Sequence, residues 1–556
     1  MFGSLGFDSP VSEISATRVD EVLQVLEFAE RESKAGSWVA VMLSYEAAPA
    51  FDPVLAVHQA SDFPLAWAGA YSEASAVTTT QSETISSNSW APRVSREEYD
   101  AAVTRIRELI AAGDTYQVNY SFPLTSSFKG DAYEWYRSLC LAQDVQYSAY
   151  LDLGRYKVLC LSPELFFERH GNQVRTRPMK GTIRRGRWPA EDRELAEWLR
   201  QSVKDRAENV MIVDLLRNDL GKVSVPGSVR VSSLFDIERF ETVWQMTSTV
   251  ESTLNDGVSL VELMSALFPC GSITGAPKIR TMEIIRELER SPRGAYTGTI
   301  GLLKPGGDCV FNVAIRAVIV DSETNQATFG VGGGVTIDST AEGEYEECLV
   351  KSRFLHTSPV EFQLFESMLL EDGEYFLLER HLERLRNSAA YFGFAFPEEQ
   401  INATLEYIKK NSGAFKVRLD LWKDGQIKTQ ISQIKNADLV RGVVMAVTPV
   451  NSSDRFLYHK TTLRDYYSED VIFWNERGEV TESRIANLVV LIDGQLYTPP
   501  ISSGLLPGTF REQLLAEGKI KERVITIEEL QNAKKFFLIN SVRKWIRVHL
   551  RSSAAQ

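Results

Sequence analysis

Two stretches in the first half of the chain place a carboxylate and a lysine in surroundings that favour chemistry. Glu164 lies in SPELF (162–166) and Lys180 lies in RPMKGT (177–182), each beside alternating, strand-like sequence. A lysine held among apolar neighbours can lose its proton and become a nucleophile, and a carboxyl group in a similar pocket can act as a general acid. Most Lys and Glu side chains are solvated. This pair alone is therefore also compatible with an ordinary polar surface.

Three glycine-bearing stretches could cradle an anion: GSITGAPK (271–278), YTGTIG (296–301) and GVGGG (330–334). Glycine lets backbone N–H groups approach a carboxylate, and a following helix N-terminus adds positive potential. GVGGG does not fit the dinucleotide pattern GxGxxG, and GSITGAPK is not GxxxxGK[ST], so their spacing argues against nucleotide binding. We expect a bare glycine turn at 332–334, and each stretch could be a tight turn and nothing more.

Acidic residues on two predicted helices suggest a metal site. Glu344 and Glu347 are three apart on one helix face, with Lys351 four residues further on, and Glu208 lies in the helical stretch DRAEN. Carboxylates from two helices that leave open positions are typical of Mg²⁺ bound beside an anionic substrate. A solvated acidic face would show the same spacing.

The second half has its own candidate lysine, Lys460 in FLYHKTTLRDYY (456–467). A lysine that forms a Schiff base with pyridoxal phosphate needs a carboxylate at the pyridinium nitrogen and a phosphate cup of N–H groups with an arginine. Glu482, the pair Gly508 and Thr509, and Arg384 could fill these roles. A surface lysine with a strand-end glutamate is the simpler alternative.

The elements that must position these residues follow from periodicity and capping. A capped helix is predicted from Ser95 to about 114, a strand at 114–123, a helix-rich stretch at 191–220 and a glycine loop feeding a helix that ends near 289. Antiparallel strands are predicted at 296–303, 309–320 and 327–331, followed by a helix from about 342. The pattern resets near 355–362, which predicts two α+β domains at 1–358 and 362–556.

The composition limits the classes of function. A chain of 556 residues exceeds one core, and its net charge of −13 argues against a general nucleic-acid binder. The five cysteines are widely spaced without CxxC pairs, which indicates a reducing compartment and no thiolate zinc site. No signal peptide and no apolar run of about 18 residues is visible, so we expect a cytoplasmic protein with no membrane segment.

Seven stretches between 95 and 356 closely resemble the chorismate-utilising enzymes: QVNYSF (117–122), RPMKGT (177–182), DRAENVMIVDLLRNDLG (205–221), FPCGSITGAPK (268–278), FNVAIRA (311–317), GVGGGVTIDS (330–339) and EYEECLVK (344–351). Seven motifs in one order make a chance match very unlikely. The resemblance implies a fold of antiparallel sheets with flanking helices. The P-x-K-G-T context of Lys180 is similar to the aminodeoxychorismate synthases, whereas anthranilate synthases carry Ala at that position.

The resemblance also implies roles. Lys180 would add to the ring of chorismate as the 4-hydroxyl leaves, ammonia would then expel it, and Glu164 would be the acid/base partner. The Mg²⁺ ligands would be Glu208 and Glu347, supported by Glu344. The substrate carboxylates would be received by Arg316, Lys351, Thr274 and the N–H groups of Gly333 and Gly334. A dianionic substrate on an acidic protein requires such local positive charge.

Two departures matter for the first half. Gln245 stands where many relatives have His, so no acid/base work is assigned there. None of the five cysteines lies in a G-x-C-x-G elbow with a suitable His downstream. We therefore expect ammonia from solution or from a separate glutamine amidotransferase subunit.

Residues 362–556 resemble the fold type IV pyridoxal-phosphate enzymes through RHLERLRNSA (380–389), HKTTLRDYY (459–467), VTESRIAN (480–487), GLLPGTFR (504–511) and NSVRK (540–544). The resemblance implies Lys460 as the Schiff-base lysine, Glu482 at the ring nitrogen, and phosphate contacts from Arg384, Gly508, Thr509 and Ser541. Family members usually have a strand pair and a D-R-G…G-D-G turn before the equivalent of FESM (365–368), and this lead is missing here. A homodimer through this domain is a further expectation.

The two resemblances together predict a fused enzyme that makes 4-aminobenzoate for folate. The front half would convert chorismate and ammonia to 4-amino-4-deoxychorismate, and the rear half would eliminate pyruvate from it. A rear half that is an amino-acid aminotransferase, or a degenerate dimerisation module, remains open.

Overall fold

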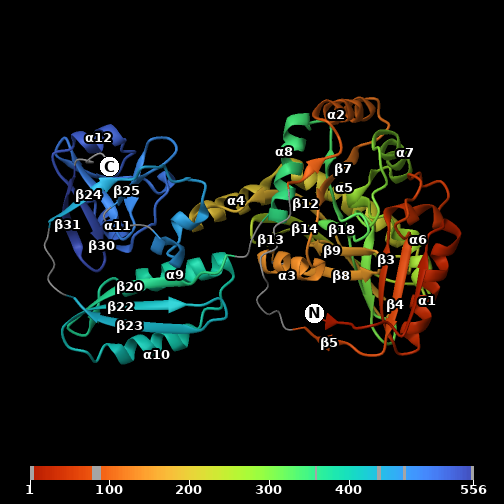
Figure 1. Cartoon of the computed structure of the whole chain (residues 1–556), viewed down its shortest axis with the longest axis horizontal. Helices are drawn as coiled ribbons and strands as arrows, with labels where there is room; N and C mark the ends of the chain where they lie inside the picture. The colour runs from red at the N-terminus through yellow and green to blue at the C-terminus, as the bar shows by residue number, and fades with distance from the viewer. Residues whose placement is uncertain are drawn as a thin grey trace. The chain divides into compact units, whose positions relative to one another are not determined.

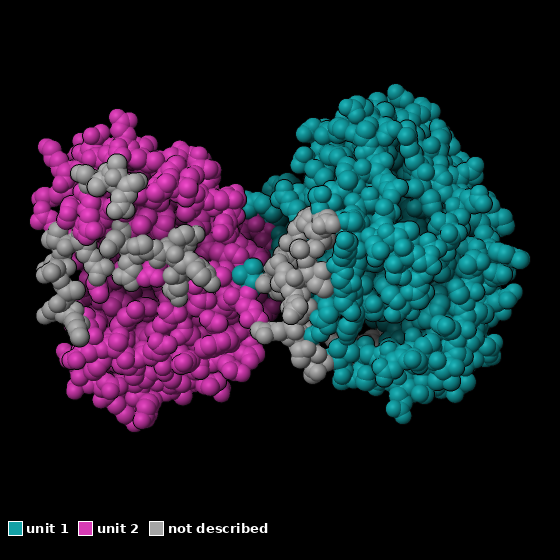
Figure 2. All heavy atoms as spheres, in the orientation of Figure 1, with its two compact units in different colours: residues 1–184, 196–360 teal, residues 185–195, 361–556 magenta. Residues whose placement is uncertain are grey.

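The computed structural model describes residues 5–77, 89–143, 145–356, 360–434, 440–466 and 471–551 (Figure 1). Contacts divide the chain into two compact units (Figure 2), Met1–Arg184 with Ala196–Val360, and Arg185–Leu195 with Glu361–Gln556. The boundary predicted at 358 falls at 357–359, outside the described residues. The second unit therefore takes in a short piece of sequence from within the first half.

Two large antiparallel sheets form the first unit (Figure 1). The ten-stranded sheet contains β2 (Ser12–Ala16), β3 (Trp38–Leu43), β4 (Ala66–Tyr71), β10 (Leu165–His170), β11 (Gln173–Arg177), β12 (Met179–Arg184), β13 (Arg230–Arg239), β14 (Val243–Thr253), β16 (Thr299–Leu303) and β17 (Cys309–Asn312). The seven-stranded sheet contains β6 (Ala91–Pro92), β7 (Gln117–Ser127), β8 (Tyr147–Leu153), β9 (Tyr156–Ser162), β15 (Gly275–Ala276), β18 (Ala317–Asp321) and β19 (Gln326–Val335). A separate pair joins β1 (Leu5–Gly6) to β5 (Ser75–Ala76).

Helices cover these sheets and separate three apolar cores. One core packs α1 (Val22–Lys34), α5 (Val203–Gly221) and α6 (Leu260–Leu267) on the ten-stranded sheet. A second packs α2 (Arg96–Ala111), α3 (Ala132–Ala142), α7 (Lys278–Leu288) and α8 (Ala341–Ser352) on the seven-stranded sheet. A third combines residues of both sheets, among them Met42, Trp67, Val158 and Ile300. Helix α4 (Pro189–Gln201) precedes α5.

The second unit has a small antiparallel sheet and a larger mixed one. The small sheet, β21 (Glu374–Tyr375), β20 (Leu364–Glu371), β22 (Ala414–Leu421) and β23 (Ile427–Gln433), packs on α9 (Leu378–Phe392) and α10 (Glu398–Ile408). The larger sheet has the order β26 (Val480–Ser483), β25 (Val471–Trp474), β24 (Val440–Met445), β31 (Lys544–Leu550), β30 (Phe536–Asn540), β27 (Asn487–Ile492), β28 (Gln495–Thr498) and β29 (Lys521–Glu522). An extra pairing of β26 with β27 closes part of it into a ring, beside α11 (Thr509–Ala516) and α12 (Ile527–Asn532).

The α+β class and the main elements predicted from the sequence are confirmed. Ser95 caps α2, and its hydroxyl accepts a hydrogen bond from the Glu98 N–H at 3.2 Å while the Glu98 side chain accepts from the Ser95 N–H. This reciprocal pair is the capping box that the sequence indicated. The predicted strand at 309–320 is in fact two strands in different sheets, because the chain bends at Arg316, which has a φ of 53°.

The glycine turn predicted at 332–334 is wrong. Gly332, Gly333 and Gly334 lie inside β19, in register with Ser121, Tyr120 and Asn119 of β7. A Cβ on Gly332 would approach the Tyr120 carbonyl oxygen to 2.4 Å, so the absence of side chains serves close strand contact here.

Within the described ranges, no helix is long and apolar enough to cross a membrane.

Candidate active sites

A bulge on β12 displays Lys180. The pairing of β12 with β14 shifts register between Met179 and Thr182, which leaves Lys180 and Gly181 outside the regular ladder. Such a bulge redirects a side chain. Gly181 has a φ of 91°, and a Cβ there would meet the Cβ of Asp205 at 2.8 Å, so glycine lets the first turn of α5 approach the strand.

Charged side chains from three other elements surround the Lys180 amine. Burial lowers the pKa of Lys180, against the opposing effects of Glu208 on α5 and of Glu164. Lys351 on α8 lowers it further, and Glu347 raises it. The predicted nucleophile, acid/base partner and metal carboxylates therefore lie within electrostatic reach of one another.

Glu164 is a buried carboxyl that can hold a proton near neutral pH. It is 4% exposed and accepts a hydrogen bond from the Ser272 hydroxyl at 2.7 Å. Its pKa is raised to about 7, because the effect of burial exceeds the lowering effects of the Ser272 hydrogen bond and the Lys180 charge. Ser272 comes from GSITGAPK, so that stretch serves the site through its hydroxyl, whereas its Lys278 is bound to Asp219 at 3.0 Å.

Two glycines of β19 open space beside Lys180. A Cβ on Gly334 would lie 2.0 Å from Gln117 Nε2 and 3.3 Å from Lys180 Nζ, and a Cβ on Gly333 would lie 2.7 Å from Glu344 Oε2. Gln117 on β7 is 1% exposed, and its Oε1 has no hydrogen-bond partner. A buried, unpaired amide oxygen beside a reactive amine is what a ligand would satisfy.

The three predicted metal carboxylates sit on α5 and α8 with mixed environments. Burial raises the pKa of Glu208 and of Glu344, and the charge of Glu344 raises that of Glu208 further. Glu347, whose side chain is 54% exposed, pairs with Lys351 at 2.7 Å. Burial raises its pKa, but Lys351 outweighs this and leaves the pKa lowered. Among described residues, no three His, Cys, Asp or Glu side chains are grouped as a metal cage.

The residues predicted to bind the substrate carboxylates have different contacts in this structure. Arg316 donates to Gln143 Oε1 at 3.3 Å, burial lowers its pKa, and no carboxylate of the described chain forms an ion pair with it. Lys351 Nζ donates to the Gly332 carbonyl at 2.8 Å. The Thr274 hydroxyl is fully buried and donates to the Cys270 carbonyl at 3.1 Å, so it contributes to loop structure.

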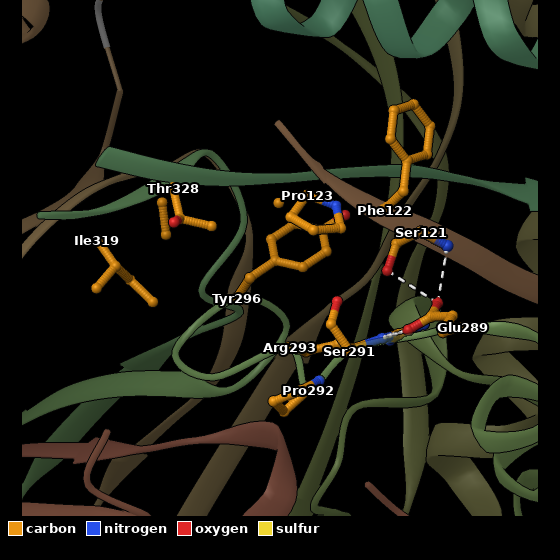
Figure 3. Close-up of a pocket in the computed structure, with 12 residues that line it drawn as sticks. Ser121, Phe122, Pro123, Glu289, Ser291, Pro292, Arg293, Tyr296, Ile319 and Thr328 are labelled. Carbon is orange, nitrogen blue, oxygen red and sulfur yellow. Dashed lines mark hydrogen bonds and ion pairs between the residues drawn. The ribbon is translucent and has the colours of Figure 1, made fainter. Parts of the chain in front are cut away.

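The hollow drawn in Figure 3 is lined by other groups, among them Ser121, Glu289 and Arg293. Tyr296 of YTGTIG and Gly330 of GVGGG also line it, but no residue with a predicted catalytic, substrate or metal role does. Ser121 donates to Glu289 from both its N–H and its hydroxyl, and Arg293 forms an ion pair with Glu289 at 2.6 Å (Figure 3). Its main polar groups are already satisfied, which is typical of a structural network.

In the second unit, Lys460 is held at the edge of the small sheet. Its carbonyl accepts from the Phe365 N–H at 3.0 Å, and its amine lies 4.8 Å from the centre of the Phe365 ring. Burial lowers the pKa of Lys460 to about 7, and the charge of Arg384 acts in the same direction. A substantial share of such an amine is unprotonated at neutral pH.

A buried cluster orients Arg384. Its guanidinium binds Glu366 with two hydrogen bonds of 2.8 and 2.7 Å and donates to the Pro507 carbonyl at 3.0 Å. His381 Nδ1 contacts Glu366 at 2.7 Å, and its Nε2 lies 3.3 Å from the Thr509 hydroxyl. This chain of contacts links Arg384 to the first residue of α11, where free N–H groups can bind an anion.

Glu482 is fully enclosed by donors. It is 3% exposed, forms a short ion pair with Arg464 and accepts from the Leu506 N–H and the Asn487 amide, each at 2.9 Å. Burial raises its pKa, although Arg464 opposes this. A Cβ on Gly508 would lie 2.0 Å from Asn487 Oδ1, so glycine is required where α11 begins.

Ser541 lies in the turn after β30, is 7% exposed and donates to the Ser367 carbonyl at 3.4 Å. Its hydroxyl makes a weaker contact than the other groups predicted for the phosphate.

Sequence reasoning missed Gln117, Arg464, and the pair His381 and Glu366. Gln117 opens QVNYSF, a stretch that was recognised without a role for this residue. Arg464 follows Lys460 by four residues in HKTTLRDYY, and that spacing was the signal available.

Comparisons with known proteins follow the same division. The family described as chorismate binding enzyme matches residues 75–357, and the amino-transferase class IV family matches residues 363–550. Aminodeoxychorismate synthase component 1 of Salmonella typhimurium is 42% identical over 270 residues, covering 48% of this chain and 59% of that protein. Its Bacillus subtilis counterpart is 41% identical over 280 residues, covering 50% of this chain and 59% of that protein.

A solved structure supports the fold of the first unit. Anthranilate synthase component I from Streptococcus pneumoniae aligns with a TM-score of 0.56 at 24% identity, covering 64% of this chain and 92% of that one. The chain spans 59% of the length of the two synthase relatives. Because the first family match alone takes in half of the sequence, the protein belongs to the chorismate binding enzymes and carries an amino-transferase class IV domain behind that match.

Proposed function

We propose that the chain makes 4-aminobenzoate in two consecutive steps, the first in residues 1–358 and the second in residues 362–556. Chorismate is aminated to 4-amino-4-deoxychorismate, which then loses pyruvate. The observation that carries the first step is the position of Lys180, whose amine lies among Glu164, Glu208 and the open face of Gly334. The relatives named as aminodeoxychorismate synthases support the same step.

In the first step each side chain has one task. The Lys180 amine forms a bond to the ring, and the 4-hydroxyl leaves as water with a proton from Glu164. Ammonia then forms the new C–N bond, and the Lys180 amine leaves. Burial prepares both groups, since it favours the neutral lysine and the protonated carboxyl. Arg316 and Lys351 receive the substrate carboxylates.

Glu208, Glu344 and Glu347 would hold Mg²⁺, which would neutralise a carboxylate of the substrate. The fit rests on Glu208 and Glu344, two partly buried carboxylates whose pKa values burial raises, with Lys204 at 3.9 Å from Glu208 as its ion-pair partner. Mg²⁺ is often held by one or two carboxylates together with substrate and water, so a complete protein cage is not needed. Lys351 would release Glu347 when the metal binds.

Ammonia comes from solution or from a separate glutamine amidotransferase. Glutamine hydrolysis by a cysteine requires an activated thiolate. Burial instead raises the pKa of Cys160, Cys270 and Cys309 to about 12, of Cys348 to about 11, and also that of Cys140. These five thiols are therefore poor nucleophiles.

The second site fits pyridoxal phosphate. Arg384 and the start of α11 at Gly508 and Thr509 would bind the phosphate, with Ser541 nearby, and Glu482 would hold a proton on the ring nitrogen. The cofactor, when bound, draws electrons from the substrate carbon that loses a proton. The Lys460 amine, freed by the substrate amine, takes that proton, and pyruvate leaves as the ring becomes aromatic. A homodimer through this domain remains a prediction.

An amino-acid aminotransferase is the second candidate for this domain, because the matching family carries that description. It would use the same Lys460 but would need a keto acid as acceptor. A dimerisation module without catalysis would not need the buried charges of Lys460, Arg384 and Glu482, which are costly to desolvate.

The test is product analysis with the full chain. Chorismate, Mg²⁺, ammonium and pyridoxal phosphate are supplied without any keto acid, and the aromatic product is identified. Equal amounts of 4-aminobenzoate and pyruvate support the proposal. Accumulation of 4-amino-4-deoxychorismate alone would leave only the first step, and formation of anthranilate would contradict both.

A further inference from the structure

The second unit contains eleven residues, Arg185–Leu195, that the chain supplies from the middle of the first catalytic half. They follow β12, which carries Lys180, and precede α5, which carries Glu208. Neither the family match at 363–550 nor the sequence patterns gave them a role in the second domain.

The segment is internally rigid at its start. Arg185, whose side chain is 3% exposed, binds Asp192 with two hydrogen bonds of 2.8 and 2.6 Å. The Gly186 N–H donates to the same carboxylate at 2.7 Å, and a Cβ on Gly186 would lie 2.1 Å from the Asp192 nitrogen. Arg187 pairs with Glu191 at 3.0 Å. These ion pairs fix the orientation of the Arg185 and Arg187 guanidinium groups.

One side of the segment contacts the loop that leads to Lys460. Arg187 Nη1 donates to the Ser452 carbonyl at 3.1 Å and to the Tyr458 hydroxyl at 3.4 Å. The Trp188 and Tyr458 rings are 5.1 Å apart. Tyr458 is 1% exposed and donates to the Ser452 carbonyl at 2.6 Å. Ser452 and Tyr458 are therefore held together by a hydrogen bond, and Arg187 and Trp188 pack against them.

A second contact supports the residue next to Lys460. The Arg185 guanidinium lies 4.3 Å from the centre of the Tyr391 ring, and that ring lies 4.4 Å from the ring of His459. Ser388 on α9 contacts His459 Nδ1 at 2.9 Å. His459, which is 1% exposed, is thus held between α9 and groups backed by the segment.

We propose that Arg185–Leu195 is a positioning segment for the second active site, in which Arg187 and Trp188 fix the loop 452–460 and so place the Lys460 amine for pyridoxal phosphate. The inference rests on the proposed role of Lys460. The first half of the chain thereby supplies support for the loop that carries Lys460, and the second unit includes this segment.

The test uses full-length Arg187→Ala and Trp188→Ala, with matched controls that alter the same residue types nearby. Arg193→Ala removes an exposed arginine of the segment, and Trp198→Ala removes a 58% exposed tryptophan of α4, the helix that begins directly after Trp188. Three quantities are measured: pyridoxal-phosphate affinity, the pH midpoint of the bound cofactor's absorbance, and amination of chorismate with ammonium.

The two test variants should bind the cofactor about tenfold more weakly, as expected for losing hydrogen bonds from a charged group or a packed aromatic contact. The pH midpoint should shift from that of the parent, because a loosened loop admits water to the Lys460 nitrogen that the cofactor engages. The charged groups around Lys460, namely Arg384, Glu366, Arg464 and Glu482, are unchanged in these variants. Amination of chorismate should stay within about twofold of the parent, and both controls should match the parent throughout.

Arg187→Lys and Trp188→Phe replace any variant that fails to fold, and each should recover part of the cofactor affinity. Parent-like affinity and pH midpoint in Arg187→Ala and Trp188→Ala would overturn the inference. A loss confined to chorismate amination would overturn it as well. Borohydride reduction and mass analysis of the parent keep the two proposals apart: if no cofactor is fixed on Lys460 there, the proposed function has failed instead.

Discussion

Lys180 and Lys460 show how neighbouring charge decides what burial does to the same side chain. Burial lowers the pKa of both amines. Around Lys180 the carboxylates Glu208 and Glu164 oppose that shift, whereas Arg384 adds to it at Lys460 and the pKa falls to about 7. The largest neighbouring charge therefore opposes proton loss at Lys180 and favours it at Lys460, so Lys180 depends on how its carboxylates are neutralised when substrate and metal bind.

Lys180→Ala should remove most amination of chorismate at low ammonia, because the covalent step is lost. A fall of about a hundredfold or more is reasonable for a positioned catalytic group. The measurement is the rate of 4-amino-4-deoxychorismate formation against ammonia concentration, with the exposed Lys129→Ala as control. Undiminished turnover at every ammonia concentration would exclude the covalent mechanism.

The rate of amination should fall as the pH rises through about 7, because the pKa of Glu164 is raised to about 7 by burial and the acid form is needed. Below that pH Glu164 keeps its proton, and above it the group is ionised and cannot protonate the leaving hydroxyl. The rate is normalised to free ammonia. Glu164→Gln should be slower and should lack this falling limb, and persistence of the limb would assign it to another group.

Glu347→Gln should weaken Mg²⁺ dependence and chorismate binding together, because the metal would bridge protein and substrate. The neighbouring exposed Glu346→Gln is the control. Mg²⁺ titrations of the amination rate measure both effects. A variant that titrates with Mg²⁺ as the parent does would remove Glu347 from the metal site.

At the scale of elements, β19 contributes to the first site through its glycines, which have no side chains. Its glycines leave room for Glu344 of α8 over Gly333, and for Gln117 of β7 and Lys180 over Gly334. The flat stretch is paired with β7 over its whole length, so its position is fixed while its surface stays open. Strand β19 thus forms one side of the site, and the other residues of the site come from neighbouring elements.

Gly334→Ala should lower kcat/KM for chorismate by about tenfold, since overpacking by one methyl group commonly costs about 1–3 kcal/mol. The added Cβ would lie 2.0 Å from Gln117 Nε2, and the strand backbone itself can accept alanine. Gly221→Ala on α5 is the matched control, because nothing lies within 4 Å of its Cβ. Parent-like kinetics in Gly334→Ala would place the substrate elsewhere.

The sequence predicted the elements better than their junctions. Helix α2 followed from its cap, and the strands of the first unit followed from alternation, because both signals are local. The sequence predicts a turn at the glycines of β19, because a strand glycine is explained only by neighbours such as Tyr120, Glu344 and Gln117 that come from distant sequence. Gln117 and Arg464 were overlooked for the same reason, because only the folded chain shows what they contact.

At the scale of the whole molecule, the chain passes between the two contact-defined units at 184/185, at 195/196 and at 360/361. A simple fusion would need only the last of these. The first two passages bracket Arg185–Leu195 and place in the second unit a piece of sequence that lies between Lys180 and Glu208. The proposed lyase suits a fused chain better than an aminotransferase does, because the second domain would then act on the product of the first.

The proton chemistry at Lys460 separates those two activities. A lyase takes a proton from the substrate carbon, releases pyruvate from the adjacent carboxyvinyl ether and gains the stability of an aromatic ring. An aminotransferase returns the proton to the cofactor and cannot complete a cycle without a keto acid. Glu482, enclosed by Arg464, Asn487 and the Leu506 N–H, is positioned to serve either reaction, so the distinction must come from products.

Supplied with 4-amino-4-deoxychorismate and no keto acid, the parent should release pyruvate and 4-aminobenzoate in equal amounts. Lys460→Ala should release neither above background, because the amine that moves the proton is gone, while the exposed Lys423→Ala should match the parent. Both products are measured over several turnovers per chain, so that a single stoichiometric event is not mistaken for catalysis. Activity in the parent that appears only after a keto acid is added would establish the aminotransferase instead. A parent that binds no pyridoxal phosphate would show that this domain, without the lead missing before Phe362, has no working cofactor site. The buried charges around Lys460 would then not serve a cofactor.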